Sequence, residues 1–258
     1  PVTAQALLAV FDEVTQAGDA VTAVIASGIV PAGLEMMDNL AIRAAEEFAA
    51  CGYPVDAALI LICELDGTES EVSQQVERVT GLFLEKGARE VRIARSEDER
   101  LKFWSGRKNA FPAVGRISPD YYCIDGTIPR KHLGNVLKGI SSLSEQFGLR
   151  VANVFHAGDG NLHPNLLFDR QNASELERVE HASKEIMKLC VEVGGTITGE
   201  HGVGIDKRDY MPLVHNETEL EMLRSVKELF DPDGLFNPGK VLPSRAAPGS
   251  ESPAGMTS

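Results

Sequence analysis

Residues 151–168 read VANVFHAGDGNLHPNLLF, and this stretch contains the clearest evidence for the fold. Two apolar runs, 151–155 and 162–168, flank a segment rich in Gly, Asp and Asn, which is typical of the turn of a β-hairpin. A tight turn joins antiparallel strands, whereas parallel strands need a long crossover connection. The stretch therefore predicts an antiparallel strand pair.

Helix-like and strand-like segments alternate over the rest of the chain. Helical periodicity is predicted to start at Thr3 and again at Asp19, and further helices are predicted over residues 39–50, 69–86, 97–114, 131–147, 173–193 and 217–230. Short apolar runs predict strands at 29–31, 57–65, 91–94 and 121–128. Together with the hairpin, this order predicts an α+β fold in which helices cover an antiparallel sheet, arranged as two ferredoxin-like halves.

The hairpin has a histidine on each arm, His156 and His163. If residues 158–161 form a four-residue loop, the two histidines lie opposite each other with Cβ atoms roughly 5 Å apart. Two neutral imidazoles at that separation can bind one divalent first-row ion, for which a carboxylate is the usual third ligand. The hairpin therefore predicts half of a metal site.

A second glycine-rich segment, GGTITGEHGVG at residues 194–204, contains an adjacent acid and histidine, Glu200 and His201. This density of glycine indicates unusual backbone dihedrals or close approach of the backbone to a ligand. An adjacent acid and histidine can divide metal ligation and proton transfer between them. Adjacency alone assigns neither role.

Composition limits the classes of partner. The formal net charge of −13 argues against nucleic acid, which needs clustered Lys and Arg. Apolar runs fall short of the ~18 residues that span a bilayer, and four widely spaced cysteines are typical of reduced cytosolic thiols. We therefore expect a cytoplasmic protein.

The two ends of the chain support separate expectations. We expect a disordered tail over residues 244–258, SRAAPGSESPAGMTS. Because the chain starts at Pro1 without Met, we also expect a processed or truncated polypeptide.

Three motifs, HAGDGNLH (156–163), GEHGVG (199–204) and LFDPDGLFNPGK (229–240), resemble in this order the C-terminal domain of the FAD-linked oxidase family. That family includes D-lactate, D-2-hydroxyglutarate and glycolate dehydrogenases. The segment GRISPDYYCIDGTIPR (115–130) is most similar to the glycolate oxidase type. The resemblance covers residues 1–243 and implies a substrate-binding cap domain, whose N-terminal FAD-binding domain lies outside this chain.

The resemblance also implies roles for the residues of the two glycine-rich segments. His156, His163 and Glu200 correspond to ligands of a divalent metal ion, with zinc, manganese and iron all left open, and His201 corresponds to the catalytic base. On this reading the metal binds the substrate hydroxyl, His201 takes its proton, and a hydride passes from the α-carbon to FAD.

Substrate and flavin contacts are implied in the same way. Arg107, in the motif WSGR, corresponds to the arginine that binds the substrate carboxylate. Relatives specific for hydroxyglutarate have a threonine and a lysine where this chain has Phe111 and Cys123, which disfavours a dicarboxylate and favours glycolate or D-lactate. Asn237 and Lys240 correspond to contacts with the flavin edge or the flavin domain.

The function expected from the resemblance is oxidation of a small 2-hydroxy acid to the 2-oxo acid, with FAD accepting the hydride. Expected partners are the flavin domain and further oxidase subunits that carry electrons onward and that would associate the protein with the membrane. We expect this chain alone to be inactive and its exposed interdomain face to favour self-association. Two alternatives stay open from the residues: a free-standing metal-dependent hydrolase or lyase, and a non-catalytic ligand-binding module.

Overall fold

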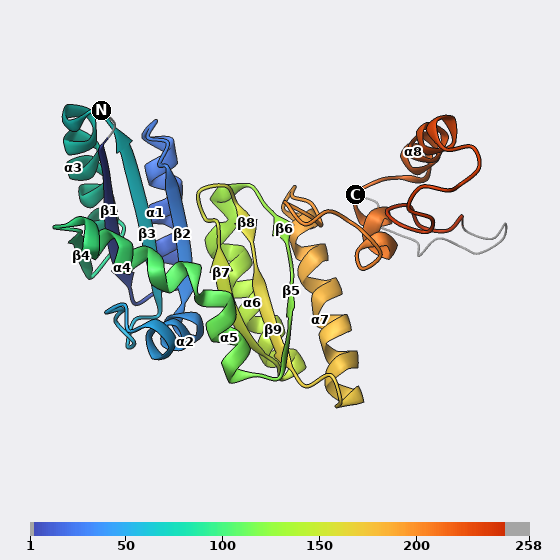
Figure 1. Cartoon of the computed structure of the whole chain (residues 1–258), viewed down its shortest axis with the longest axis horizontal. Helices are drawn as coiled ribbons and strands as arrows, with labels where there is room; N and C mark the ends of the chain where they lie inside the picture. The colour runs from blue at the N-terminus through green and yellow to red at the C-terminus, as the bar shows by residue number, and fades with distance from the viewer. Residues whose placement is uncertain (1–2, 246–258) are drawn as a thin grey trace. The chain divides into compact units, whose positions relative to one another are not determined.

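The computed structural model describes residues 3–245. The chain divides into two compact units, residues 1–200 and residues 201–258. A seven-stranded sheet forms the centre of the first unit, in the order β4-β1-β3-β2-β7-β9-β5 (Figure 1). Every pairing in it is antiparallel, which confirms the predicted α+β class. Its strands are β1 (Thr3–Phe11), β2 (Gly33–Asp38), β3 (Leu59–Gly67), β4 (Glu90–Ile93), β5 (Asp120–Cys123), β7 (Arg150–Phe155) and β9 (Pro164–Phe168).

The sheet consists of two halves that meet between β2 and β7. Strands β4-β1-β3-β2 have the order of a complete ferredoxin-like motif, and β7-β9-β5 provide three strands of the second half. The two halves are joined through the pairs Met36↔Phe155 and Met37↔Val154. A separate two-stranded ribbon, β6 (Gly126–Thr127) with β8 (Asn161–Leu162), lies beside the second half.

Helices cover both faces of the sheet. One row consists of α3 (Glu69–Glu85), α1 (Val14–Ala26), α6 (Leu133–Phe147) and α7 (Ala173–Glu192), each in contact with the next. The other layer consists of α2 (Asn39–Ala49), α4 (Glu97–Lys108) and α5 (Ala110–Ile117), which contact one another. In Figure 1, α4 and α5 cross in front of the sheet, whereas α1 and α6 lie behind it.

The first strand shows why the two-sided covering matters. Alternate side chains of a strand point to opposite faces. Leu8 and Val10 of β1 belong to the core under α2, α4 and α5, whereas the Phe11 ring contacts Phe83 of α3. Both faces of β1 are buried, so its sequence is a continuous apolar run rather than an alternating one. The helix predicted from Thr3 is wrong for this reason.

Other boundaries also differ from prediction. Residues 29–31 form no strand, and β2 begins instead at Gly33. Helix α1 begins at Val14, so Asp19 is inside it rather than at its start. The single helix predicted over 97–114 is divided at Asn109 into α4 and α5, because Pro112 has no N–H to bond back to the preceding turn. The helix predicted over 217–230 is confirmed.

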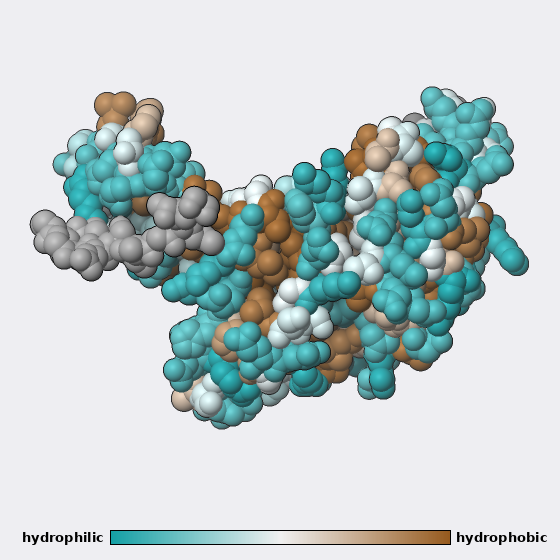
Figure 2. Space-filling view, turned by 180° about the vertical axis from the view of Figure 1, so that it is seen from behind, coloured by the Kyte–Doolittle hydropathy of each residue, from teal (hydrophilic) through white to brown (hydrophobic). Residues whose placement is uncertain are grey.

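The second unit contains the short helix η2 (Arg208–Leu213) and α8 (Glu217–Phe230). Asn216 begins α8 with a capping box, and Asp231 ends it by accepting the backbone N–H groups of Leu235 and Phe236. Four large apolar side chains of α8 are more than half exposed, namely Met222, Val226, Leu229 and Phe230. Figure 2 shows hydrophobic residues, in brown, on the surface of the molecule.

Two sequence predictions concern segments at the limits of the structure. The predicted disordered tail, residues 244–258, lies outside the described residues from position 246 onward. Among residues 3–245, every helix is too short or too polar to cross a membrane.

Candidate active site

The hairpin at residues 151–168 forms with a register that differs from the predicted one. His156 pairs with Asn161 around the loop 157–160, and Asn153 pairs with Pro164. His163 therefore lies opposite Val154, and the backbone N–H of Val154 donates to the carbonyl oxygen of His163. His163 lies diagonally across the hairpin from His156. The predicted pairing of His156 with His163 is wrong by two residues. A two-residue shift keeps a side chain on the same face of a strand, so the two histidines still meet.

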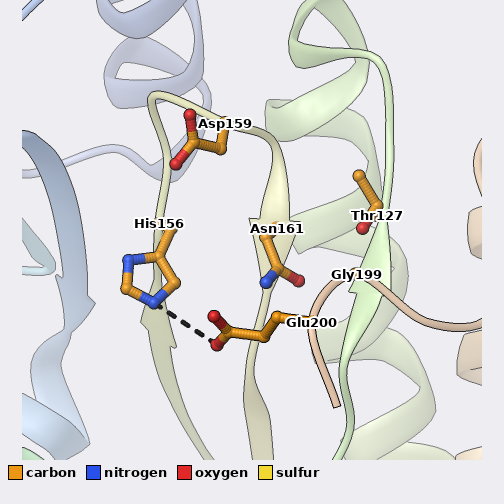
Figure 3. Close-up of a pocket in the computed structure, with 6 residues that line it drawn as sticks. All are labelled: Thr127, His156, Asp159, Asn161, Gly199 and Glu200. Carbon is orange, nitrogen blue, oxygen red and sulfur yellow. Dashed lines mark ion pairs between the residues drawn. The ribbon is translucent and has the colours of Figure 1, made fainter. Parts of the chain in front are cut away.

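The two imidazole rings and Glu200 converge. The ring centroids of His156 and His163 are 5.3 Å apart and their planes are at 83°. Glu200 Oε1 lies 2.9 Å from His163 Nε2 and 3.7 Å from His156 Nε2, the second contact being drawn in Figure 3. The structure thus brings together the three residues that the sequence predicts as metal ligands.

The other ring nitrogens face acceptors outside this cluster. His156 Nδ1 lies 3.0 Å from Glu35 Oε1, and His163 Nδ1 lies 3.3 Å from the carbonyl oxygen of Ile124. Since both partners are acceptors, each Nδ1 carries the proton, and in a neutral ring Nε2 carries a lone pair. In that tautomer the lone pair of His163 faces the carboxylate of Glu200, and either a proton or a metal ion must lie between these two acceptors, which are 2.9 Å apart. Nε2 of each histidine faces the same carboxylate oxygen of Glu200, so the three residues are candidate ligands of a divalent metal ion.

The two histidines have opposite pKa shifts. The hydrogen bond to the Glu35 carboxylate raises the pKa of His156 above its ordinary value. Burial lowers the pKa of His163, and the neighbouring His156 lowers it further. His163 is 1% exposed, so its neutral form, the form that binds metals, is favoured.

Arg107 lies next to this cluster and is linked to it through Glu35. Its Nε donates to Glu35 Oε2 at 2.9 Å, and its Nη2 lies 2.8 Å from the same oxygen. Both side chains are buried. Sequence reasoning identified Arg107 but missed Glu35, although an acid within the otherwise apolar part of GLEMMD (33–38) is a signal that could have found it.

A second carboxylate that the sequence analysis missed holds the loop of Glu200. Asp125 is fully buried and accepts hydrogen bonds from Thr198 Oγ1 at 2.8 Å and from the backbone N–H of Gly199 at 3.0 Å. It also accepts the N–H of Glu200. One ligand atom from each of Asp125, His163 and Glu200 lies within 4.8 Å of the others.

A cavity of about 300 Å³ opens beside His156 and Glu200 (Figure 3). Its lining residues come from β6, from the hairpin and from the loop after α7, and are Thr127, His156, Asp159, Asn161, Gly199 and Glu200. The ring of Phe111 contacts His163, with their ring centroids 6.1 Å apart. The cluster is therefore bordered by a polar cavity and an aromatic ring.

Three predicted site residues belong to the second unit. His201 is its first residue and has an exposed side chain. Asn237 has a φ of 47° in an exposed turn, where its Oδ1 accepts a hydrogen bond from Lys240 Nζ at 3.3 Å. The base role of His201 and the flavin contacts of Asn237 and Lys240 stay predictions.

Comparison with known proteins agrees with the motifs. The family described as FAD linked oxidases, C-terminal domain, matches residues 1–241. The chain is 59% identical over 244 residues to glycolate oxidase subunit GlcD of Escherichia coli (strain K12), which covers 95% of this chain and 49% of that protein. It is 35% identical to the GlcD subunit of Bacillus subtilis (strain 168), over 93% of this chain and 51% of that protein.

More distant proteins extend the comparison. Mitochondrial D-lactate dehydrogenase (cytochrome) of Arabidopsis thaliana is 28% identical, over 90% of this chain and 41% of that protein. The solved structure of p-cresol methylhydroxylase with substrate bound superposes with a TM-score of 0.72 at 13% identity, over 93% of this chain and 52% of that one, which shows a shared fold. The chain spans about half the length of the relatives it matches. With a match over residues 1–241, the chain belongs to the family of FAD linked oxidases, C-terminal domain.

Proposed function

We propose that this chain is the substrate- and metal-binding half of a flavin-dependent enzyme that oxidises a small 2-hydroxy acid, glycolate or D-lactate, to the 2-oxo acid. The observation that carries the proposal is the convergence of His156, His163 and Glu200 next to the buried Arg107–Glu35 pair. The names of the relatives, glycolate oxidase subunit GlcD and D-lactate dehydrogenase, support this substrate class.

In this proposal His156, His163 and Glu200 hold a divalent ion, with zinc, manganese and iron as candidates. When bound, the ion lowers the pKa of the substrate hydroxyl and FAD accepts the hydride from the α-carbon, which together with loss of the hydroxyl proton gives the 2-oxo acid. The half-exposed side chain of Glu200 leaves the ligand cluster accessible from solvent, as a substrate requires.

Arg107 binds the substrate carboxylate in this proposal. Glu35 contacts Nε and Nη2 of its guanidinium and so fixes the orientation of this group. Phe111, which contacts the ring of His163, limits the length of the acid and favours glycolate or D-lactate over a dicarboxylate.

The remaining assignments follow the resemblance. His201 takes the hydroxyl proton, and Asn237 and Lys240 contact the flavin or its domain. FAD is held mainly by the part of the relatives that this chain does not match, which makes the flavin half a necessary partner. We also propose that further oxidase subunits carry the electrons onward, and that the protein is cytoplasmic and reaches the membrane through them.

The test uses the complete, flavin-containing protein. Mixing it without oxygen with glycolate, D-lactate or D-2-hydroxyglutarate should bleach the flavin absorbance fastest with one of the two short acids. His163→Ala should abolish bleaching while FAD remains bound, because a buried ligand of the ion is removed. His181→Ala, on the exposed surface of α7, is the matched control and should bleach like the wild type.

Other results would support the alternatives. Hydrolytic or lyase turnover that persists after FAD is removed would indicate a free-standing metal enzyme. Unchanged bleaching in His163→Ala would show that the chemistry does not depend on the hairpin histidines.

A further inference from the structure

Glu35 has two carboxylate oxygens, and each contacts a different candidate site residue. Oε1 lies 3.0 Å from Nδ1 of His156, and Oε2 accepts the hydrogen bond from Nε of Arg107 at 2.9 Å. Only 11% of the Glu35 side chain and 9% of the Arg107 side chain are exposed. One buried carboxylate therefore connects a candidate metal ligand with the candidate binder of the substrate carboxylate.

The contacts of Glu35 cross the junction between the two halves of the sheet. Glu35 belongs to β2 of the first half and His156 follows β7 of the second, and these strands are joined by Met36↔Phe155, the residues next to them. Backbone pairing fixes the two strands, so the side-chain contact is built on rigid elements rather than on a loop. Arg107 reaches the same carboxylate from α4.

The direction of each bond determines what Glu35 does. A carboxylate at Nδ1 fixes the histidine tautomer and the ring orientation, which leaves Nε2 of His156 turned towards Glu200. The same carboxylate neutralises the buried guanidinium of Arg107 and holds its Nε–Nη2 edge. Gln at this position offers only one acceptor oxygen, so it can serve one of the two partners but not both.

We propose that Glu35 is a positioning residue that orients both the metal ligand His156 and the substrate-binding Arg107. The inference rests on the proposed function and adds to it a residue that acts through others and touches neither metal nor substrate. It implies that the binding of metal and the binding of the acid both weaken when this single carboxylate is removed.

The experiment measures Mn²⁺ affinity of the metal-free complete protein, by the loss of the free-ion EPR signal, before any turnover assay. Glu35→Gln should weaken Mn²⁺ binding by about 10- to 100-fold, the usual effect of removing the partner of a ligating histidine. In enzyme saturated with Mn²⁺, Glu35→Gln should still raise the KM for glycolate because Arg107 is no longer held.

Glu64→Gln is the matched control. Glu64 is also a largely buried acid of the sheet, and it binds an arginine of the same helix, Arg100, with N···O 2.6 Å, yet no histidine. Mn²⁺ affinity of Glu64→Gln should equal that of the wild type. Glu35→Gln leaves Arg107 buried without a counter-charge and could therefore fail to fold. In that case the double variant Glu35→Met/Arg107→Met replaces the ion pair by apolar groups. It should bind Mn²⁺ about 10- to 100-fold more weakly than the wild type.

A double-mutant cycle separates positioning from a general structural effect. In a His156→Ala background, Glu35→Gln should have no further effect on Mn²⁺ affinity, whereas two independent structural losses would add. Wild-type Mn²⁺ affinity in Glu35→Gln, or simple additivity in the cycle, would overturn the positioning role of Glu35 and leave the proposed function untouched. A wild-type protein that binds no Mn²⁺ would overturn the metal site of the proposed function, and the positioning role with it.

Discussion

The carboxylate of Asp125 accepts the backbone N–H of Glu200, with its two oxygens 3.1 and 3.2 Å from that nitrogen. Asp125 lies between β5 and β6, and Glu200 lies 75 residues further along the chain. The bond holds the backbone of a residue whose side chain faces the two hairpin histidines. A buried acid thereby fixes the backbone position of Glu200.

Asp125→Asn should destabilise the first unit and displace Glu200. The two oxygens of the Asp125 carboxylate share three donors, whereas the asparagine amide has only one acceptor oxygen. Its NH₂ group would face backbone N–H groups, which are also donors. Charge-assisted hydrogen bonds of this kind contribute on the order of 2 kcal/mol. Urea unfolding should show a loss of about that size, and Asp66→Asn, at an exposed position of β3, should stay within about 0.5 kcal/mol of the wild type.

Gly199→Ala should weaken metal binding through sterics. A Cβ at this position would lie 2.5 Å from Asn161 Oδ1 and 2.6 Å from Thr127 Oγ1, so the loop that carries Glu200 has to move. Gly81→Ala in α3 is the control, because a Cβ there meets nothing within 4 Å and alanine favours a helix by about 1 kcal/mol. Mn²⁺ affinity equal to the wild type in Gly199→Ala would contradict the close packing of this loop.

The buried thiols should be inert in the folded chain. Burial raises the pKa of Cys51 to about 12 and that of Cys63 to about 12, so neither forms an appreciable thiolate at pH 8. Cys190 is fully buried, whereas Cys123 is half-buried. A thiol-specific chromophoric reagent at pH 8 should label at most Cys123 quickly, and Cys123→Ser should abolish the fast phase. Rapid labelling of two or more thiols would show that the core opens readily.

The two hairpin histidines should affect acid stability with opposite signs. The pKa of His163 is below the unfolded value of ~6.5, so the unfolded chain binds the proton more readily, and the stability that neutral His163 provides is lost as pH falls below ~6.5. The pKa of His156 is raised, so its contribution is present below ~6.5 and is lost as pH rises through the folded value.

Unfolding midpoints of the metal-free chain between pH 5 and 8 should test this difference. His163→Gln should make the protein lose less stability on acidification than the wild type loses. His156→Gln should instead lower stability most at the acid end of the range. Equal slopes for the two variants would contradict the opposite shifts.

Helix α8 and strand β1 show where prediction of the fold from sequence succeeded and where it failed. Helix α8 keeps a polar face, and its predicted bounds, 217–230, agree with the structure. Strand β1 is covered by helices on both sides, so its period of two is hidden in a continuous apolar run. Only its pairing with β3 and β4, which the sequence does not show, determines that it is a strand.

Site residues close together in the sequence were predicted, whereas acids whose partners are distant in sequence were missed. His156 and His163 were found because a turn separates them by a few residues, and their register was wrong because residues 157–160, rather than 158–161, form the loop. Glu35 and Asp125 were missed because their partners lie 121 and 75 residues away. Each is a single acid in an apolar segment, and its hydrogen-bond partners can be identified only once the strands are paired.

Because the proposed metal site depends on the junction of β2 and β7, metal binding should report whether the two halves of the sheet have assembled correctly. His156 can be held by Glu35 only after both halves of the sheet have folded and paired in the register Met36↔Phe155. Contacts between segments so distant in sequence form late, because a long loop must close first. A chain whose halves fold separately but mispair would retain most of its secondary structure and still bind metal poorly. On the proposed function, metal occupancy would therefore distinguish properly joined molecules in a preparation from misassembled ones that circular dichroism would count as folded.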